Sequence, residues 1–192
     1  MRVVVGLRNP SSDYVGTRHN LGFEVVERLL DRTGESLSKA PSRVKAIVSQ
    51  AGVGEDRTLF LVPNTFMNDS GGAVSAALSY YKVETDDLLV VHDDIDLPLG
   101  RLRLQVAGGS GGHNGIRSVE KSVGTKEFSR LKVGVGRPPG SMDPADFVLR
   151  PFTKTERPDA EVIIEDSADI VELWLTDRTK AQEGASLRGK DG

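Results

Sequence analysis

The three histidines of this 192-residue chain all lie beside polar residues, where acid–base chemistry is possible. His92 precedes Asp93 at the end of an aliphatic run, and His19 and His113 are each followed by asparagine. A histidine paired with an aspartate can act as a general base, because the carboxylate fixes the imidazole tautomer and stabilises the cation that forms. These residues therefore predict a site of proton transfer.

The nucleophile that such a base would activate is predicted to be water. The chain contains no cysteine and no GxSxG motif, so neither a thiolate nor a serine on a nucleophile elbow is available. Carboxamides such as Asn9 and Asn68 can donate hydrogen bonds to an oxygen that gains negative charge. The residues alone therefore indicate a hydrolase that acts on an activated acyl group, without choosing its substrate.

The stretch from Leu88 to Asp96 predicts how these residues are positioned. Its aliphatic residues are typical of a strand buried on both faces, and such strands deliver their last residues to a ligand-binding crevice. The apolar segment from Val3 to Leu7 predicts a second buried strand that ends close to Asn9. Six candidate residues lie at the ends of elements that an α/β sheet gathers along one edge: Asn9, His19, Asn68, Asp93, His113 and Asn114.

Strands and helices alternate along the rest of the chain, which predicts an α/β fold. Apolar spacing predicts a helix that follows Asn20 as its cap and stops at Gly34, and Ser70 is expected to cap an alanine-rich helix that ends at Tyr81. A hairpin over residues 44–62 implies a mixed sheet. Further strands are expected at 101–106 and 131–135, and further helices at 116–123 and 156–174.

We therefore predict one α/β domain over residues 1–180, a sandwich in which helices flank a twisted mixed β-sheet. Residues 181–192 are polar and are expected to form a frayed C-terminal tail. No apolar stretch approaches the roughly 20 residues that a membrane span needs, and the apolar run at the N-terminus is too short for a signal peptide. The expected location is the cytoplasm, with no membrane partner.

Charge is distributed unevenly, although the net charge is only −3. Eight basic and two acidic residues lie between Leu97 and Arg137, whereas six basic and ten acidic residues lie between Pro151 and Gly192. A polyanion responds to the nearby charges, because charges beyond a Debye length of about 8 Å are largely screened. The first region thus predicts either a polyanion-binding surface or an ordinary solvated one.

Several motifs occur in the order seen in one enzyme family. They are Gly6-Leu7-Arg8-Asn9-Pro10, Tyr14, Thr17-Arg18-His19-Asn20, Phe66-Met67-Asn68-Asp69-Ser70-Gly71, His92-Asp93-Asp94-Ile95-Asp96 and Gly111-Gly112-His113-Asn114-Gly115. Together they resemble the bacterial peptidyl-tRNA hydrolases, and the resemblance extends to about Trp174. The Asn and His of the family's last helix are not evident between Gln182 and Gly192.

The resemblance implies a monomeric, cytosolic esterase that needs no cofactor or metal. Such an enzyme cuts the ester between a peptide and the 3′ ribose of tRNA, and its tRNA contacts would include the 3′ end and the acceptor stem. By the same resemblance, His19 activates water and Asp93 polarises it. The remaining implied site residues are the catalytic Asn9 and the substrate-binding Tyr14, Met67, Asn68, His113 and Asn114.

Two alternatives remain open at this point. One is a metallohydrolase, because His19, His113 and the acids after His92 offer nitrogen and oxygen ligands for a divalent ion. The acids are adjacent, however, and alternate strand residues point to opposite sides. The other is an RNA-binding relative that has lost hydrolysis, which the presence of Asn9, His19 and Asp93 argues against.

Overall fold

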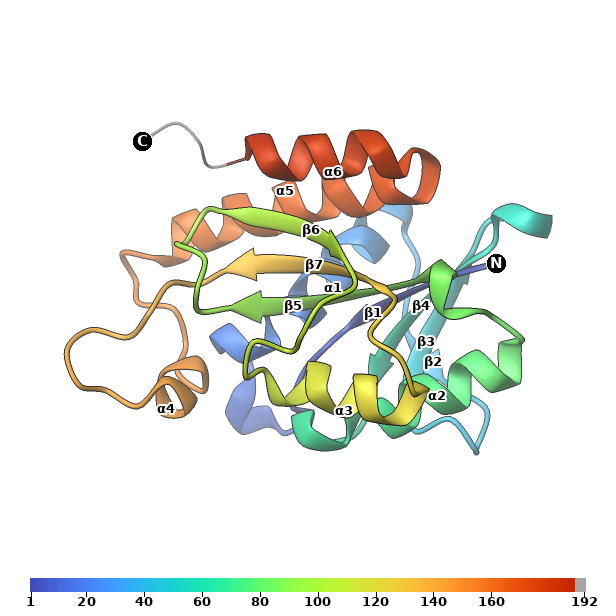
Figure 1. Cartoon of the computed structure of the whole chain (residues 1–192), viewed down its shortest axis with the longest axis horizontal. Coiled ribbons are helices and arrows are strands. Elements are labelled where there is room, and N and C mark those ends of the chain that lie inside the picture. Colours follow the sequence, from blue (N-terminus) through green and yellow to red (C-terminus); the bar gives the residue numbers. More distant parts are fainter. Residues whose placement is uncertain (189–192) are drawn as a thin grey trace.

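The aliphatic run expected at the centre of the protein forms strand β5 (Leu88–Asp94) in the computed structural model, which describes residues 1–188. β5 pairs in parallel with β1 (Arg2–Gly6) on one side and with β7 (Ser129–Gly134) on the other (Figure 1). β1 also pairs in parallel with β4 (Thr58–Pro63). The carboxyl ends of these four strands therefore share one edge of the sheet.

Antiparallel strands complete the sheet on both sides. β3 (Ala46–Ala51) pairs with β4, and the short β2 (Ser38–Lys39) pairs with β3. On the opposite side, β6 (Leu102–Val106) pairs with β7, which gives the order β2-β3-β4-β1-β5-β7-β6. The mixed sheet predicted from the hairpin is confirmed, and β2 is a two-residue strand that the sequence did not predict.

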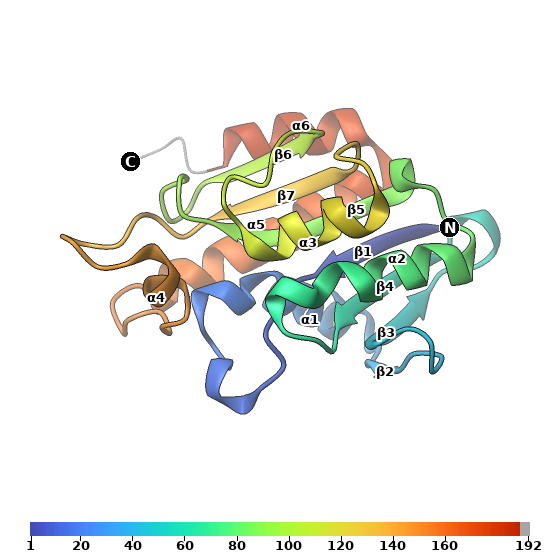
Figure 2. The same cartoon turned by 60° about the horizontal axis from the view of Figure 1, so that its bottom comes forward.

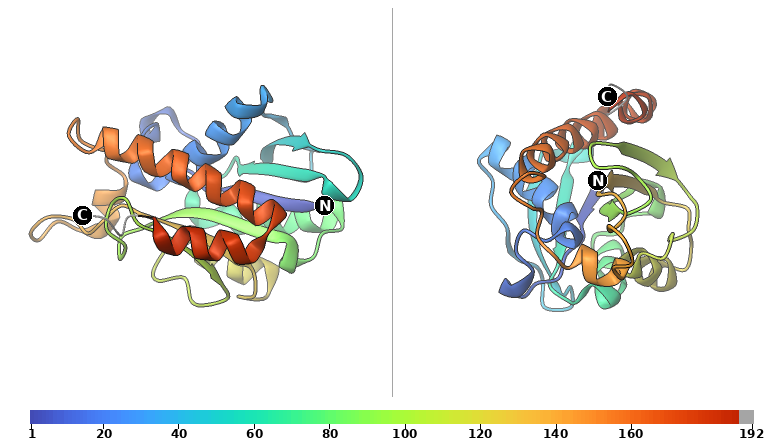
Figure 3. Two further views of the ribbon diagram at one scale, coloured as in Figure 1. Left: turned by 90° about the horizontal axis from the view of Figure 1, so that it is seen from above. Right: turned by 90° about the vertical axis from the view of Figure 1, so that its left-hand side faces the viewer.

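Helices cover both faces of the sheet. α1 (Leu21–Thr33), α5 (Arg157–Thr176) and α6 (Arg178–Leu187) lie on one face, as the view from above in Figure 3 shows. α2 (Ser70–Tyr81) and α3 (Asn114–Val123) lie side by side on the other face (Figure 2). Alternate residues of β1 serve the two layers: Val4 packs with the first group, and Val3 and Val5 pack with the second. The predicted α/β sandwich is confirmed.

Helix α1 packs unusually close to the sheet. A Cβ atom on Gly22 would lie 2.2 Å from the carbonyl oxygen of Val91, and one on Gly6 would lie 2.5 Å from the carbonyl oxygen of Gly22. Only glycine allows this approach, because any larger side chain would clash with backbone atoms. The contact brings the residues that precede α1 against the ends of β1 and β5.

The helix starts differ in part from the predictions. Gly34 ends α1 with a φ of 69°, as expected. Ser70 does not cap α2: it is the first helical residue, and its hydroxyl donates to the carbonyl of Met67 at 2.8 Å. Asn20 occupies the cap position of α1, but its side chain makes no capping bond. Both polar side chains instead bond to the loops that carry the candidate site.

The predicted frayed tail is wrong as far as residue 187. Helix α6 begins at Arg178, so the expected boundary between residues 180 and 181 falls inside a helix, and Ala181 and Ala185 are fully buried. These small residues are four positions apart and present one apolar face, a pattern too weak to stand out in a polar sequence. Residues 189–192 of the predicted tail lie outside the described residues. Between residues 1 and 188, no helix combines the length and apolar composition of a membrane span.

Candidate active site

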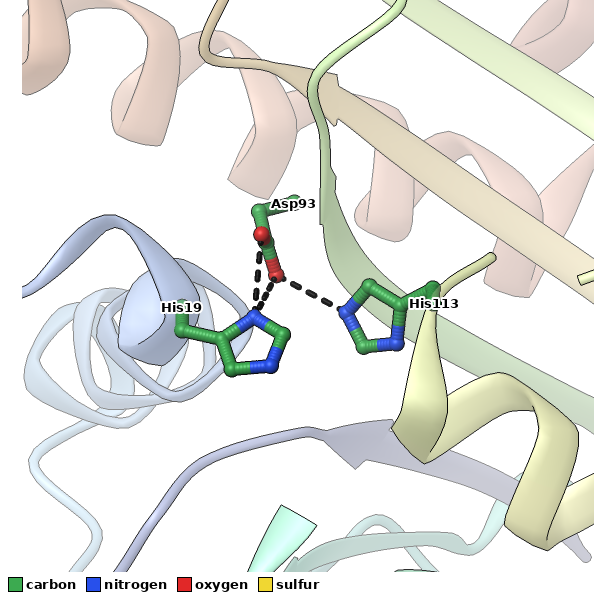
Figure 4. A group of neighbouring side chains, drawn as sticks. All are labelled: His19, Asp93 and His113. Carbon is green, nitrogen blue, oxygen red and sulfur yellow. Dashed lines mark hydrogen bonds and ion pairs between the residues drawn. The ribbon is translucent and has the colours of Figure 1, made fainter. Parts of the chain in front are cut away.

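Three side chains from distant parts of the chain meet at the carboxyl edge of the sheet (Figure 4). Asp93 lies near the end of β5, His19 lies in a 3₁₀ turn (Arg18–Asn20) before α1, and His113 directly precedes α3. His19 Nδ1 lies 2.9 Å from Asp93 Oδ1 and 3.0 Å from Oδ2. His113 Nε2 lies 2.9 Å from the same Oδ1. The structure thus brings His19 and Asp93 together, as the sequence predicted.

Backbone hydrogen bonds fix the tautomer of His113. Its Nδ1 accepts from the backbone N–H of Gly115 at 3.1 Å and of Ile116 at 3.3 Å, so His113 caps helix α3. Because a backbone N–H can only donate, Nδ1 carries no proton. The proton of the neutral ring is therefore on Nε2, where it is donated to Asp93.

The same carboxylate fixes the orientation of His19. An ionised aspartate only accepts hydrogen bonds, so Nδ1 of His19 carries the proton that lies toward Asp93. The lone pair of the neutral ring is then on Nε2, which has no hydrogen-bond partner among residues 1–188. His19 is thus oriented to accept a proton through Nε2.

Burial and charge act against each other on these groups. Burial would raise the pKa of Asp93, but the neighbouring His19 and His113 outweigh it and hold that pKa far below its usual range. Burial likewise lowers the pKa of His19, whereas the charge and hydrogen bond of Asp93 raise it, and the net shift is upward. Asp93 therefore stays ionised near neutral pH, and His19 becomes a stronger base than a free histidine.

Asn9 is held so that its amide group is free to donate. Its Oδ1 accepts from the backbone N–H of Met67 at 2.8 Å, which identifies the oxygen, because an N–H cannot bond to the NH₂ group. Asn20 clamps the backbone of Asn9 twice, accepting from its N–H at 2.8 Å and donating to its carbonyl at 3.0 Å. The Nδ2 group of Asn9 thus remains available to a bound oxygen atom.

A cleft of about 1030 Å³ contains this group of residues. Seven of the eight predicted site residues line it: Asn9, His19, Met67, Asn68, Asp93, His113 and Asn114. Tyr14, the eighth, is half-buried in the 3₁₀ turn Ser12–Tyr14, outside that lining, and its carbonyl accepts from the Thr17 hydroxyl at 2.8 Å. Its predicted contact with substrate stays a prediction.

One wall of the cleft was not predicted from the sequence. It is formed by the short helix α4 (Pro144–Val148), which contributes Val148 and the following Leu149 to the lining. The Asp143-Pro144 pair is a typical helix start, because Asp143 accepts from the N–H of Ala145 at 2.7 Å and proline fits the first turn. That pair is the signal by which α4 could have been found.

Arg18 fastens this wall to the 3₁₀ turn that carries His19. Its guanidinium donates to the carbonyls of Arg150 at 3.1 Å and Pro151 at 3.0 Å and to Glu156 at 2.6 Å, and it is only 3% exposed. It also lies 4.0 Å from the ring centre of Phe147. Because Arg18 directly precedes His19, the residue that bonds to Asp93 is next in sequence to the residue that holds α4.

His92 supports the site from inside the sheet. Its Nδ1 donates to the carbonyl of Asp93 at 2.7 Å, and its ring packs edge-on against His113 with 4.7 Å between ring centres. Burial is the largest cause that lowers the pKa of His92 well below 6.5, so this ring is neutral. His92 therefore packs as an uncharged side chain beneath His113.

The alternative of a metal centre is weakened by how its donors are used. His19, Asp93 and His113 have ligand atoms within 4.8 Å of one another, which would permit a three-residue site. Those atoms already bond to each other, however, and Nδ1 of His113 is occupied by the start of α3. Two further acids of the predicted ligand set pair with cations, Asp94 with Lys132 at 3.3 Å and Asp96 with Arg137.

The basic region between Leu97 and Arg137 does not form one continuous surface. Arg130 is fully buried, where it bonds to Glu120 at 2.9 Å and to the carbonyl of Gly109 at 2.8 Å. Lys132 is paired with Asp94, the last residue of β5, and Arg137 is paired with Asp96 on the loop that follows. Binding of a polyanion by this region stays a prediction. Only some of its eight cations could take part, because Arg130 is buried and Lys132 and Arg137 are paired.

Comparisons with known proteins agree with this geometry. A family model described as peptidyl-tRNA hydrolase matches residues 3–190. The peptidyl-tRNA hydrolase of Frankia casuarinae is 50% identical over 175 residues, which cover 91% of this chain and 88% of that protein. The peptidyl-tRNA hydrolase of Pseudarthrobacter chlorophenolicus is 41% identical over 181 residues, 94% of this chain and 92% of that protein.

Solved structures give the same result. The crystal structure of peptidyl-tRNA hydrolase from Acinetobacter baumannii superposes with a TM-score of 0.90 at 31% sequence identity, covering 98% of this chain and 95% of that chain. Similarity thus extends over nearly the whole sequence and the whole fold. The chain belongs to the peptidyl-tRNA hydrolase family.

Proposed function

We propose that the protein hydrolyses the ester bond between the peptide and the 3′ ribose of peptidyl-tRNA, and so recycles tRNA from stalled or aborted translation. His19 acts as the general base for water, and Asp93 supports it. One observation carries the proposal: a buried, ionised Asp93 bonds to Nδ1 of His19 at 2.9 Å, which leaves Nε2 as the basic atom in the cleft.

The reaction then follows from acid–base chemistry. Nε2 of His19 takes a proton from water as the water oxygen attacks the ester carbonyl. When the tetrahedral intermediate collapses, the bond between the carbonyl carbon and the ribose oxygen breaks, and the proton on Nε2 passes to that oxygen. The products are a peptide with a free carboxyl group and a tRNA with a free 3′ hydroxyl. Asp93 stays ionised throughout and stabilises the imidazolium.

The neighbouring amides position the ester. Nδ2 of Asn9 donates to the ester oxygen that gains negative charge, a role for which its fixed Oδ1 leaves it free. Asn68 and Asn114 hold the peptide and the terminal nucleotides, and Met67 and His113 form the surface beneath them. Four further points remain predictions. They are the contact of Tyr14 with substrate, the contact with the acceptor stem, the monomeric state and the cytoplasmic location.

The central test replaces the base. His19→Ala is expected to lower turnover of peptidyl-tRNA by about 100- to 10,000-fold, because general-base catalysis contributes that much. Binding of tRNA and the thermal unfolding curve should match those of the wild type, which excludes misfolding. Wild-type turnover by the variant would refute the assignment, and loss of wild-type activity in excess chelator would favour a metal centre instead.

A further inference from the structure

A second groove opens beside the catalytic cleft, between helices α2 and α3. It has a volume of about 720 Å³ and shares Asn68, Asp69 and Asn114 with the cleft. Because these residues line both hollows, the groove and the cleft adjoin at Asn68, Asp69 and Asn114. An extended ligand held at Asn68 and Asn114 would span both hollows across these residues.

Small residues form the floor of this groove. The backbone N–H of Gly71 in α2 donates to the hydroxyl of Ser118 in α3 at 2.9 Å. A Cβ atom on Gly71 would lie 2.0 Å from the carbonyl oxygen of Ser118, so only glycine permits this close crossing of the helices. Ala73 and Ser122 line the groove nearby. The space above the crossing is thus unobstructed by large side chains.

Four basic side chains line this groove, two from each of two segments of the chain. Arg117 and Lys121 come from α3, and Arg43 and Lys45 come from the segment that leads into β3. All four are exposed, and none forms an ion pair with any side chain that the structure describes. Asp69 is the one acid in the described lining. The groove therefore favours an anionic ligand.

We propose that this groove binds the part of the peptide that lies beyond the ester-linked residue, and that it favours peptides with acidic side chains. This inference rests on the proposed hydrolysis of peptidyl-tRNA. Asn68 and Asn114 at the junction each offer a donor and an acceptor, which suits a peptide backbone. No aromatic ring is part of the described lining, whereas single-stranded RNA is usually held by stacking on aromatic rings.

The geometry of helix α3 determines which peptide side chains would contact Arg117 and Lys121. Arg117 and Lys121 follow Asn114 by three and seven positions, which places them about 4.5 Å and about 10.5 Å further along α3. An extended peptide advances about 3.3 Å per residue. Acidic side chains one to three residues beyond the residue held at Asn114 should therefore meet the two cations.

The test compares two peptidyl-tRNAs that share the same tRNA and the same ester-linked residue. Their N-acetylated peptides carry either glutamate or glutamine at the three preceding positions. The wild type should cleave the glutamate substrate with a kcat/KM about two- to fivefold higher at low salt, as expected for exposed charge pairs, and added salt should reduce the preference.

Charge-removing variants locate the effect. Arg117→Gln combined with Lys121→Gln should abolish the preference and leave cleavage of the glutamine substrate unchanged, and Arg43→Gln combined with Lys45→Gln should act in the same direction. The matched control, Lys126→Gln combined with Lys154→Gln, removes two exposed cations outside the groove and should retain the preference.

Three results would overturn the inference. They are equal cleavage of both substrates by the wild type, a preference that survives all the groove variants, and an equal loss on both substrates in the Arg117 and Lys121 double variant. The last of these would assign the groove to tRNA phosphates. Failure of the wild type to cleave either substrate would instead reject the proposed function, so the two failures are distinguishable.

Discussion

One buried carboxylate determines the protonation of two imidazoles in this site. Asp93 accepts a hydrogen bond from both His19 and His113, but only His113 is also bound through its second nitrogen. The two rings therefore differ in their ability to accept a proton from a ligand, although their side chains are similarly buried, with 11% of His19 and 8% of His113 exposed. Within the described part of the chain, His19 has a free ring nitrogen that can exchange a proton with a ligand, whereas both ring nitrogens of His113 are already bonded, to Asp93 and to the start of α3.

Asn9 offers a prediction at the same scale. Asn9→Asp keeps the acceptor that Met67 uses but replaces the free NH₂ donor with an oxygen that repels negative charge. We expect turnover to fall about 100- to 1000-fold, which is typical when one donor to a developing oxyanion is lost. The measurement is kcat on peptidyl-tRNA, with the thermal unfolding curve as a control for folding. Turnover within about twofold of the wild type would show that Asn9 has no catalytic role.

The sequence predicted the positions of these residues better than their partners. Asp93 lies near the end of β5 and Asn9 lies shortly after β1, so their arrival at one sheet edge follows from chain order and strand direction. The bonds from Asn20 to the backbone of Asn9 depend on how α1 packs, which local sequence does not encode. From the sequence alone, Asn20 is therefore expected to act as a helix cap.

At the scale of elements, Arg18 joins the turn that carries His19 to helix α4. Its bonds to the carbonyls after α4 and to Glu156 join segments more than 125 positions apart in the sequence. Arginine suits this role because its planar guanidinium spreads five N–H donors over three nitrogens in a fixed fork, whereas lysine has three donors on a single nitrogen. The wall of the cleft therefore depends on a residue that faces away from the reaction.

Substitution of Arg18 tests this coupling. Arg18→Lys should lower the free energy of unfolding by about 2–4 kcal/mol, because it leaves buried carbonyls unpaired and weakens the bond to Glu156. The matched control Arg137→Lys changes a largely exposed arginine and should cost less than about 0.5 kcal/mol. Denaturant unfolding measures both changes. Equal, small effects would show that Arg18 does not anchor α4.

The elements that the sequence predicted best are those with long apolar patterns. β5, α1 and α3 were predicted within about two residues of their observed ends. The five-residue helix α4 has too few positions for an apolar periodicity to show. Ser70 lies inside α2 and does not precede it, because the 3₁₀ turn Met67–Asp69 runs directly into this helix. Short and fused elements are the ones that pattern reasoning missed.

At the scale of the whole molecule, acidic residues of the C-terminal segment that starts at Pro151 pair with basic residues elsewhere in the chain. Glu165 and Asp169 of α5 pair with Arg32 of α1, which also bonds to Glu172 at 3.1 Å, and Arg28 of α1 pairs with Glu161 at 2.9 Å. The uneven charge seen in the sequence thus arises partly from one interface between helices. The number of these charges is evident from the sequence, but which acidic residue pairs with which arginine depends on how α1 packs against α5.

Helix α6 packs on the same face of the sheet as α1 and α5. Placing a charged residue at one of its buried positions tests whether this packing stabilises the protein. Ala185→Asp should lower the free energy of unfolding by at least about 3 kcal/mol, because it buries an unpaired carboxylate, and this would lower Tm by about 6–12 °C. Gln182→Asp adds the same charge at an exposed position of α6 and should change Tm little. If both variants melt alike, the segment frays as the sequence suggested.

The pairing of His19 with Asp93 is tested most directly by the pH dependence of single-turnover cleavage, in the wild type and in Asp93→Asn. In the proposed mechanism His19 acts in its neutral form. Because Asp93 raises the pKa of His19 above the ordinary 6.5, wild-type activity should fall as the pH drops through a midpoint above that value. Asp93→Asn should be slower and its midpoint should move to lower pH. A wild-type rate independent of pH from about 5 to about 9, or a midpoint unchanged by the substitution, would contradict the account.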